Sequence, residues 1–449
     1  MAQVAKSPQA LATYLATLAA GGVFVPLNTA YTRGEVQSLF EDAEPALLIA
    51  DPQAPLGTST SHTPVLTLDA DGNGSLTAAA EDATPIEPVA APLTSPAVML
   101  FTSGTTGRPK GVPLTGHNLA TNARMLHDAW LFGPDDRLLH MLPLFHVHGL
   151  FVALHPVLLA GGTLSFHGRF HPGTVIDDLD RCSVVMGVPT MYSRLLEQAN
   201  LDRDRTRSIR LFACGSAPLT AQTHERFAER TGHAIVERYG MTEAGIMTSN
   251  PYDGDRIPGT VGYPFPGVRL RIVDDHGSSL PTGVPGNVQA TGPNVFEGYW
   301  QRPDATADVF TDDGWLRTGD VGSLSVDGRL TLDGRASDLI ISGGLNIAPR
   351  QIEEALESSP SIDEVAVVGI PHPDLGETVV AFVVADRFDE DAARSCLADL
   401  ARFKHPKSYV ELPGLPRNAM GKVEKGRLRD EYSGLFATTQ TLPTADQRT

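Results

Sequence analysis

The sequence predicts a multidomain α/β protein whose large N-terminal domain contains doubly wound, mostly parallel sheets. The chain has 449 residues, of which 41% are hydrophobic, and this is more apolar material than one ordinary core needs. Strand-type and helix-type segments alternate through its first half, a pattern typical of parallel strands joined by helices. Ligands bind such sheets beyond the carboxyl ends of the strands, so the loops that follow strands are the candidate site.

Individual elements follow from hydrophobic spacing. Residues 9–21 are rich in Ala and Leu at helical intervals and precede the apolar run 23–27, so we expect a helix and then a strand. Residues 98–101, 183–186 and 210–214 are short apolar runs of the buried-strand type, each followed by a turn and a helical stretch.

The character of the sequence changes twice in its second half. Short strands separated by Gly, Pro and Asp turns predict a small β-rich subdomain at about 259–334. Beyond it, helices near 349–358 and 391–401 and strands near 365–369 and 379–384 predict a compact α+β module. The expected organisation is an N-terminal domain at 1–336, a C-terminal domain at 337–436 and a polar, disordered tail at 437–449.

Composition argues against several classes of partner. The formal net charge is −18 and Lys and Arg are not clustered, which disfavours nucleic-acid binding. The longest apolar stretch, 150–160, contains Pro156 and is too short to span a bilayer, and the first ten residues do not resemble a signal peptide. Three cysteines without metal-type spacing fit reduced thiols. We therefore expect a cytoplasmic protein that acts on small molecules, and the oligomeric state stays open.

A loop rich in glycine and hydroxyl side chains follows the expected strand at 98–101. Glycines let backbone amides turn towards an anion, the hydroxyls donate, and a lysine adds a positive charge, so the loop suits phosphate. It lacks the Gly-Lys-Ser/Thr spacing of a Walker loop, and a flexible surface turn is the alternative. Its candidate ligand residues are Thr102, Ser103, Gly104, Thr105, Thr106, Gly107 and Lys110.

This loop resembles the phosphate loop of the adenylate-forming enzymes, the superfamily of acyl-CoA synthetases, firefly luciferase and the adenylation domains of nonribosomal peptide synthetases. The resemblance covers nearly the whole chain to about residue 432, and among its members it is closest to the malonyl-CoA synthetases. The other matching segments, in the family's order, are PLFH at 143–146, GSAP at 215–218, ERYGMTE at 237–243, TGD at 318–320, GR at 334–335, PRN at 416–418 and GK at 421–422.

The resemblance implies an ATP-dependent ligase that forms an acyl-adenylate and passes the acyl group to coenzyme A. Two anions must be brought together, so cations and fixed dipoles should carry catalysis. Glu243 and Thr106 would lie near Mg²⁺, which prefers oxygen ligands, and Asp320 would bind the ribose hydroxyls beside Arg335. A helix-terminal carboxylate and a solvated turn are the alternatives for the two acids. The remaining nucleotide-site residues implied are Gly215, Ser216, Ala217, Glu237, Tyr239, Gly240, Met241 and Thr242.

The resemblance also makes the C-terminal domain a mobile lid. Lys422 matches the lysine that reaches the α-phosphate and carboxylate oxygens during adenylation, although a lysine in such a tail is often simply solvent-exposed. After adenylation the lid would rotate and present Gly343, Gly344 and Leu345 to the pantetheine of CoA. Relatives carry Lys or Asp at the hinge where this chain has Ser337, so we expect altered closure kinetics rather than loss of function.

Three residues bear on the acid substrate. His146 resembles the catalytic histidine beside the acyl pocket that gates it or faces the carboxylate, with metal binding as the alternative. Arg238, within a motif of malonyl-CoA synthetases, and Arg256 would bind a second carboxylate, unless they pair with structural acids such as Glu237. Each charge-assisted bond contributes roughly 1.5–3 kcal/mol, which predicts about a 10- to 100-fold preference for malonate over propionate.

The expected function is therefore an acid–CoA ligase for malonate or methylmalonate. A ligase for another acid, a non-catalytic adenylate-binding protein and a carrier-loading adenylation domain are the competing interpretations. The interpretation as a non-catalytic protein arises because the family usually has a longer stretch before the segment that matches Met1. Either the start is assigned too late or part of the cover of the first subdomain is missing.

Overall fold

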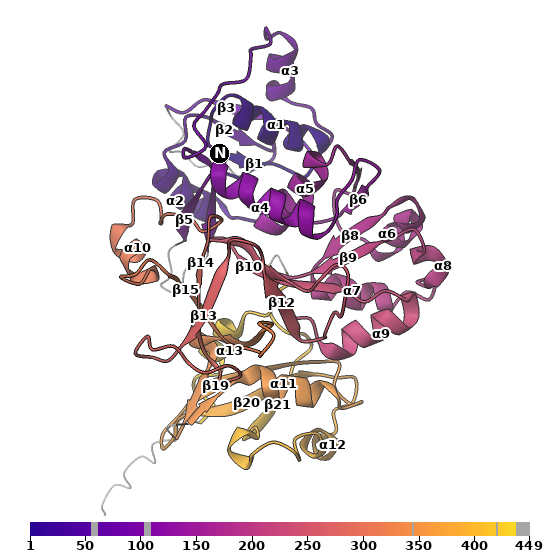
Figure 1. Ribbon diagram of the computed structural model, residues 1–449, viewed down its shortest axis with the longest axis vertical. Coiled ribbons are helices and arrows are strands. Elements are labelled where there is room, and N and C mark those ends of the chain that lie inside the picture. Colours follow the sequence, from indigo (N-terminus) through magenta and orange to yellow (C-terminus); the bar gives the residue numbers. More distant parts are fainter. Residues whose placement is uncertain (55–61, 103–108, 344, 419–420, 437–449) are drawn as a thin grey trace, which may run out of the picture.

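The computed structural model describes residues 1–54, 62–102, 109–343, 345–418 and 421–436 (Figure 1). The tail expected at 437–449 lies outside these residues. The N-terminal elements lie at one end of the molecule and the C-terminal elements at the other (Figure 1). No helix within the described ranges is long and apolar enough to cross a membrane.

The N-terminal end is built on a small parallel sheet. Its strands are β1 (Ala2–Gln3), β2 (Leu48–Ala50) and β3 (Val65–Thr67), in that order. The helix expected at 9–21 is confirmed as α1 (Pro8–Ala19), which begins where the Ser7 side chain accepts a hydrogen bond from the Ala10 amide. The other helices of this end are α2 (Arg33–Ala43) and α3 (Ser75–Glu81).

The prediction of a strand at 23–27 is wrong. This run forms only isolated bridges, from Phe24 to Val98 and from Pro26 to Ala2. It crosses between two sheets and pairs with each at a single residue, and Pro26 has no amide hydrogen with which to extend a ladder. Residues 24–27 are nevertheless buried, as their apolar composition predicts, whereas Val23 is exposed.

An eleven-stranded sheet forms the centre of the molecule. One half of it is parallel, in the order β10-β9-β8-β6-β7, and the other half is antiparallel, in the order β13-β14-β15-β16-β12-β11. The expected α/β fold class is confirmed, and the β-rich segment continues the same sheet. The strands are β6 (Arg137–His140), β7 (Thr163–Phe166), β8 (Val184–Gly187), β9 (Leu211–Cys214), β10 (Val236–Met241), β11 (Gly245–Ser249), β12 (Thr260–Pro264), β13 (Arg269–Val273), β14 (Gly286–Thr291), β15 (Leu316–Leu324) and β16 (Leu330–Arg335).

The parallel half is buried on both faces, as a doubly wound sheet requires. In β9, Leu211 and Ala213 join one hydrophobic core, whereas Phe212 between them joins another. This alternation explains why the run reads as continuously apolar in the sequence. The helices of this half are α4 (Gly116–Ala129), α5 (Leu154–Leu159), α6 (Pro172–Asp178), α7 (Pro189–Leu196), α8 (Arg203–Thr206) and α9 (Ala221–Thr231), with a π-helix at His148–Ala153.

The strand expected at 98–101 exists but has a different partner. It is β4 (Pro96–Thr102), which pairs antiparallel with β5 (Lys110–Thr115) in a two-stranded sheet of its own. A second strand, rather than a helix, therefore follows the glycine-rich loop. Helix α4 begins only after β5, where Thr115 and Asn118 form a capping box.

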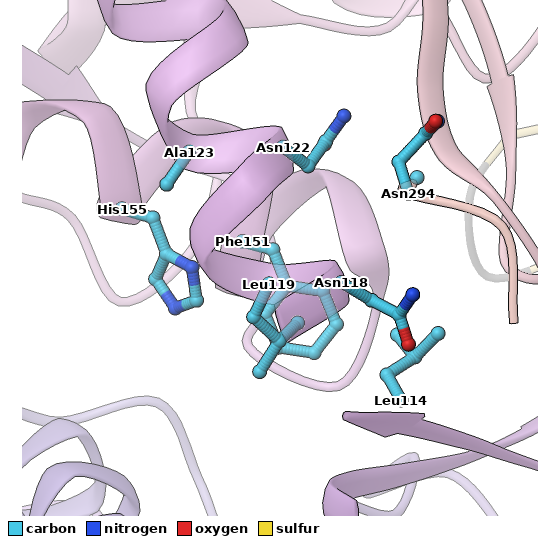
Figure 2. A pocket seen from close by; sticks show the side chains of 9 residues that line it. Leu114, Asn118, Leu119, Asn122, Ala123, Phe151, His155 and Asn294 are labelled. Carbon is cyan, nitrogen blue, oxygen red and sulfur yellow. The ribbon is translucent and has the colours of Figure 1, made fainter. Parts of the chain in front are cut away.

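Three asparagines form hydrogen bonds that join α4, the segment around residues 293–295 and the start of β11. Asn122 donates from Nδ2 to the Ile246 carbonyl and accepts from the Ile246 amide, while Asn118 donates to the carbonyl of Val295. Asn294 donates to the carbonyl of Ala244. Figure 2 shows Asn118 and Asn122 on the helix, with Asn294 across from them. These bonds fix the position of the turn between β10 and β11.

The C-terminal part has its own five-stranded sheet with a hydrophobic core on each face. Its central strands pair without interruption from Glu364↔Val384 to His372↔Gly376. The elements are β17 (Ile340–Ser342), β18 (Leu345–Ile347), α11 (Pro349–Glu357), β19 (Glu364–His372), β20 (Gly376–Val384), α12 (Glu390–Ser395), β21 (Ser408–Glu411) and α13 (Lys425–Glu431), while α10 (Pro303–Val309) lies earlier in the chain.

Candidate active site

Asp320 and Arg335 form a charged pair on neighbouring strands. They are register partners on β15 and β16, and Arg335 Nε lies 3.0 Å from Asp320 Oδ1. The Tyr239 hydroxyl donates to the other carboxylate oxygen, Oδ2. Burial raises the pKa of Asp320, while the charge of Arg335 and the Tyr239 bond act in the opposite direction. Three residues that the resemblance assigns to the nucleotide are thus in direct contact.

Glu243 lies in the turn that follows β10 and is buried. The Tyr299 hydroxyl donates to its Oε1 at 2.9 Å, and the Lys110 ammonium lies 4.9 Å from the centroid of the Tyr299 ring. Tyr299 therefore connects Glu243 to the lysine at the end of the glycine-rich loop. The sequence interpretation missed Tyr299, because no motif marks it and only the fold brings it to this place.

A buried carboxylate oxygen is a suitable ligand for Mg²⁺. The described residues contain no group of three or more His, Cys, Asp or Glu side chains that could hold a metal. Mg²⁺ bound at Glu243 would therefore take most of its ligands from phosphate and water, as this ion commonly does. Thr106, the second expected metal ligand, lies outside the described residues, as do Ser103, Gly104, Thr105 and Gly107.

Lys422 reaches the charged pair from the C-terminal domain. Burial lowers its pKa, as does the nearby charge of Arg335, whereas Asp338 and Asp320 act in the opposite direction. Asn418 holds the hairpin that carries it, by accepting from the Lys422 amide at 3.1 Å and donating its own amide to the Lys422 carbonyl at 2.9 Å. The C-terminal domain thus places Lys422 near Asp320 and Arg335 in this structure.

Arg238 is a buried cation in an unusual setting. Its side chain lies against Gly215, where a Cβ atom would come within 2.5 Å of Arg238 Cζ. Its Nε and Nη2 atoms are buried and make no hydrogen bond to any described residue. Burial lowers the pKa of Arg238 to about 10. A guanidinium in such a place has donors ready for an anion.

Two histidines accompany this arginine. His148 lies near Arg238, and its Nδ1 is 3.2 Å from Ser216 Oγ. The Nε2 atoms of His148 and His146 are buried without a partner among the described residues. Burial lowers the pKa of His146 to about 4 and that of His148 well below its usual value, so both rings are neutral at pH 7. We call Arg238, His146, His148 and Gly215 the arginine pocket.

Glu237, the acid that could pair with Arg238 instead of a substrate, has other partners. Glu237 contacts His224 and the Gly259 amide, both at 3.3 Å, because neighbouring side chains on a strand point to opposite faces. The alternative that Arg238 pairs with Glu237 is not what the structure shows.

Arg256 does not have the free donors expected of a carboxylate ligand. It donates from Nη1 to the Ala234 carbonyl at 2.6 Å, from Nη2 to Tyr252 at 2.7 Å and from Nε to Pro251 at 3.3 Å. All three nitrogens are used by backbone carbonyls around a tight loop. The expectation for Arg256 is therefore corrected: its donors are used by backbone carbonyls, and not by the structural acid that was the alternative.

The other expected residues lie at or near the ends of strands. Ser216 has a positive φ of 73°, which is uncommon for a residue with a side chain. Gly240 packs so closely on β11 that a Cβ atom would come within 2.1 Å of the Gly245 carbonyl oxygen. Gly343 and Leu345 flank the turn between β17 and β18, where Gly344 lies outside the described residues; Thr102 ends β4, Met241 ends β10, Thr242 follows it and Ala217 follows Ser216.

The fold and this grouping of cations, carboxylates and small residues define an adenylate-forming enzyme. The chain belongs to the AMP-binding enzyme family: residues 2–300 match that family, and residues 351–422 match the AMP-binding enzyme C-terminal domain. The resemblance drawn from the motifs is thereby confirmed. The chain is an AMP-forming acid–CoA ligase that uses ATP and coenzyme A.

Solved and curated relatives include ligases for small acids. The chain is similar to ATP-bound MatB from Rhodopseudomonas palustris, with a TM-score of 0.93, 45% identity and coverage of 97% of this chain and 88% of that one. It is similar to a malonyl-CoA ligase with methylmalonyl-CoA and AMP bound, with a TM-score of 0.67, 38% identity and coverage of 93% and 90%. It is 37% identical to a sulfoacetate–CoA ligase of Cupriavidus necator over 92% of this chain and 84% of the relative.

Proposed function

We propose that this ligase activates a small acid with a second negative charge, malonate or methylmalonate, and converts it to the CoA thioester. The observation that carries the proposal is the arginine pocket, where Arg238 is buried with two nitrogens unpartnered by any described residue. A buried cation without a counter-charge is costly, and a bound anion offsets that cost. An acid with only one carboxylate would leave the guanidinium unpaired.

The geometry of the guanidinium favours a planar anion. Its two unpartnered atoms, Nε and Nη2, are the pair that can donate side by side to the two oxygens of a carboxylate. The neutral rings of His146 and His148 can add a donor each without adding a charge. The small Gly215 leaves room for the guanidinium.

In the first step, the other carboxylate attacks the α-phosphorus of ATP, a P–O bond forms, and the bond to pyrophosphate breaks. Positive charge near the carboxylate and phosphate oxygens stabilises the negative charge that develops during this attack. It would come from Lys422, Lys110 and Arg335. Mg²⁺ held at Glu243 would supply further positive charge to the phosphates. In the second step, the CoA thiolate attacks the acyl carbon and AMP leaves. Asp320 and Arg335 would hold the nucleotide through both steps.

The named relatives support a substrate with two anionic ends. One was solved with methylmalonyl-CoA, and another is a ligase for sulfoacetate, whose far end is a sulfonate. Sulfoacetate is therefore the second candidate, because a guanidinium also binds sulfonate oxygens. An aryl or medium-chain acid fits the arginine pocket less well than a diacid, because it has no second anionic group to pair with Arg238.

The test is pyrophosphate release with malonate, methylmalonate, sulfoacetate, succinate, propionate and benzoate, each with and without CoA. We expect the first two acids to exceed propionate by about 10- to 100-fold in kcat/KM. Higher activity with sulfoacetate would make it the substrate, and higher activity with propionate or benzoate would overturn the proposal. ATP binding without pyrophosphate release with any acid would indicate a non-catalytic protein. Transfer to a carrier protein but not to CoA would indicate an adenylation domain.

A further inference from the structure

One close contact joins the lysine hairpin of the lid to the large domain. Gly421, the residue before Lys422, lies so near Thr190 that a Cβ atom at position 421 would come within 2.7 Å of Thr190 Oγ1. Gly421 also has a φ of 75°, which a residue with a side chain adopts only under strain. The contact therefore depends on glycine both for space and for backbone shape.

Thr190 is held firmly on the large domain. It lies in the first turn of α7, directly after Pro189. Two residues later, Tyr192 is fully buried and donates from its hydroxyl to the Ala213 carbonyl at the end of β9, at 2.8 Å. The start of α7 is thus fixed to the central sheet, and Thr190 cannot follow the lid when the lid moves.

The described residues of this hairpin, 416–418 and 421–424, are also joined by hydrogen bonds. Arg417 donates from Nη1 to the Gly421 carbonyl at 2.7 Å and forms an ion pair with Glu364 on β19, at 2.8 Å. The Gly421 amide donates to the Asn418 carbonyl at 2.8 Å, in addition to the two bonds between residues 418 and 422, one of which is accepted by the Asn418 side chain. Because these bonds tie the hairpin to the lid sheet, placing Gly421 also places Lys422.

We propose that Thr190 is a positioning residue for the adenylation step. Its side chain contacts Gly421 and limits how closely the lid hairpin approaches the large domain, and this limit sets the position of Lys422 in the site. We call this contact surface of Thr190 the seat. The proposal deepens the proposed function, since it depends on the role of Lys422 given there. Thr190 acts through Lys422 and needs no contact with the substrates. The seat operates only in the lid orientation seen here, so the transfer to CoA does not require it.

The experiment separates the two half-reactions. Thr190→Leu enlarges the seat and pushes the hairpin outward, so we expect the acid-dependent exchange of pyrophosphate into ATP to fall by roughly tenfold or more. Transfer from a supplied acyl-adenylate to CoA should stay within about twofold of wild type, a change too small to reflect a lost contact. Thr190→Ser keeps Oγ1 and should retain the exchange activity.

The matched control is Ser193→Leu, which adds the same side chain one turn further along α7, at an exposed position. It should leave both half-reactions unchanged. If Thr190→Leu slows both half-reactions together, Thr190 supports the acyl pocket or the fold and the seat is refuted. If Thr190→Leu behaves like Ser193→Leu, the contact is incidental and the seat is equally refuted.

A second pair of variants tests the contact itself. Gly421→Ala should slow exchange by roughly tenfold or more, because it adds an atom against Thr190 and strains the backbone. Thr190→Ala removes both side-chain atoms nearest to position 421, so the double variant should recover part of that loss. Additive losses in the double variant would refute the contact as the cause.

The failure of the seat can be told apart from the failure of the proposed function. If the wild-type chain shows no pyrophosphate exchange with any acid, the proposed function fails. If the wild type exchanges and Thr190→Leu does so equally well, only the seat fails. Thermal unfolding of each variant, measured alongside, shows whether a loss comes from the fold.

Discussion

The side chain of Arg238 lies directly against the backbone of Gly215, at a separation that leaves no room for even one carbon atom. This contact joins the end of β9 to the neighbouring strand β10. It holds the guanidinium on one side of the arginine pocket. The size of residue 215 is therefore linked to the position of the residue that would bind the acid.

Gly215→Ala tests this link. A Cβ atom at 215 would lie within 2.6 Å of three guanidinium atoms, so Arg238 must move into the space that the acid would occupy. We expect kcat/KM for malonate to fall by about tenfold or more while activity with propionate changes less. Steady-state kinetics with both acids measure this. An equal loss with both would mean that residue 215 affects only the nucleotide.

Arg238→Leu should remove the preference for a second anion. We expect a roughly 10- to 100-fold loss of kcat/KM with malonate and methylmalonate and little change with propionate. Removing an unpaired buried cation should also leave the free energy of unfolding unchanged or slightly higher. Kinetics with the acid panel and denaturant unfolding test both parts.

Arg256→Leu is the matched control for Arg238→Leu. It removes three hydrogen bonds to backbone carbonyls, each contributing about 1 kcal/mol, so the free energy of unfolding should fall by roughly 1–3 kcal/mol. The ratio of malonate to propionate activity should stay as in the wild type. A shift of that ratio would return Arg256 to the acid site.

Lys422→Ala should separate the two half-reactions. Adenylation brings two anions together and needs the ammonium beside Asp320 and Arg335, so pyrophosphate exchange should be abolished. Transfer from a supplied acyl-adenylate to CoA should be retained, because in the proposed mechanism the C-terminal domain would then present another face. Equal loss of both activities would refute the assigned role.

Acid should destabilise the protein through its buried histidines. Burial lowers the pKa of His140 to about 3 and those of His146 and His155 to about 4, whereas the unfolded value is about 6.5. Between these values the unfolded chain binds more protons than the folded one. The contribution of these histidines to stability is therefore complete above pH 6.5 and falls towards pH 4, by up to about 1.4 kcal/mol per pH unit for each histidine.

Denaturant unfolding at several pH values measures this slope. His155 is a suitable site for a control, because it lies against Tyr14, whose hydroxyl is 2.7 Å from His155 Nε2. His155→Gln keeps a polar partner for Tyr14 and removes the titrating ring, so the slope should decrease. An unchanged slope would show that His155 does not contribute to it.

The sequence predicts the fold class and many elements, and its failures have a common physical reason. The runs 183–186 and 210–214 became β8 and β9, because β-branched and apolar residues without interruption fit a sheet buried on both faces. The runs 23–27 and 98–101 have the same composition but lie between sheets or in a separate pair. Composition indicates burial, and only tertiary packing decides which strand is the neighbour.

In the candidate site, too, the sequence indicates some residues and only tertiary packing reveals the others. Motifs located Asp320, Arg335, Tyr239 and Lys422, which the structure brings together, because each carries its chemistry in its own side chain. Tyr299 could not be found in this way, since its position beside Glu243 arises from a contact across 56 residues of sequence. Thr190 was missed as a contact of Gly421 for the same reason, and Arg256 was misjudged because its backbone partners are not visible in a sequence.

The pairing of Asp320 with Arg335 has a consequence for the order of events. Both residues precede Ser337 in the chain and belong to the central sheet, so a rotation of the C-terminal domain about Ser337, which the resemblance implies, would leave them where they are. The adenylate intermediate would thus stay in place while a different face of the C-terminal domain turns towards it. Pyrophosphate would then depart before the thiol arrives, and the enzyme would follow ping-pong kinetics with AMP among the last products released.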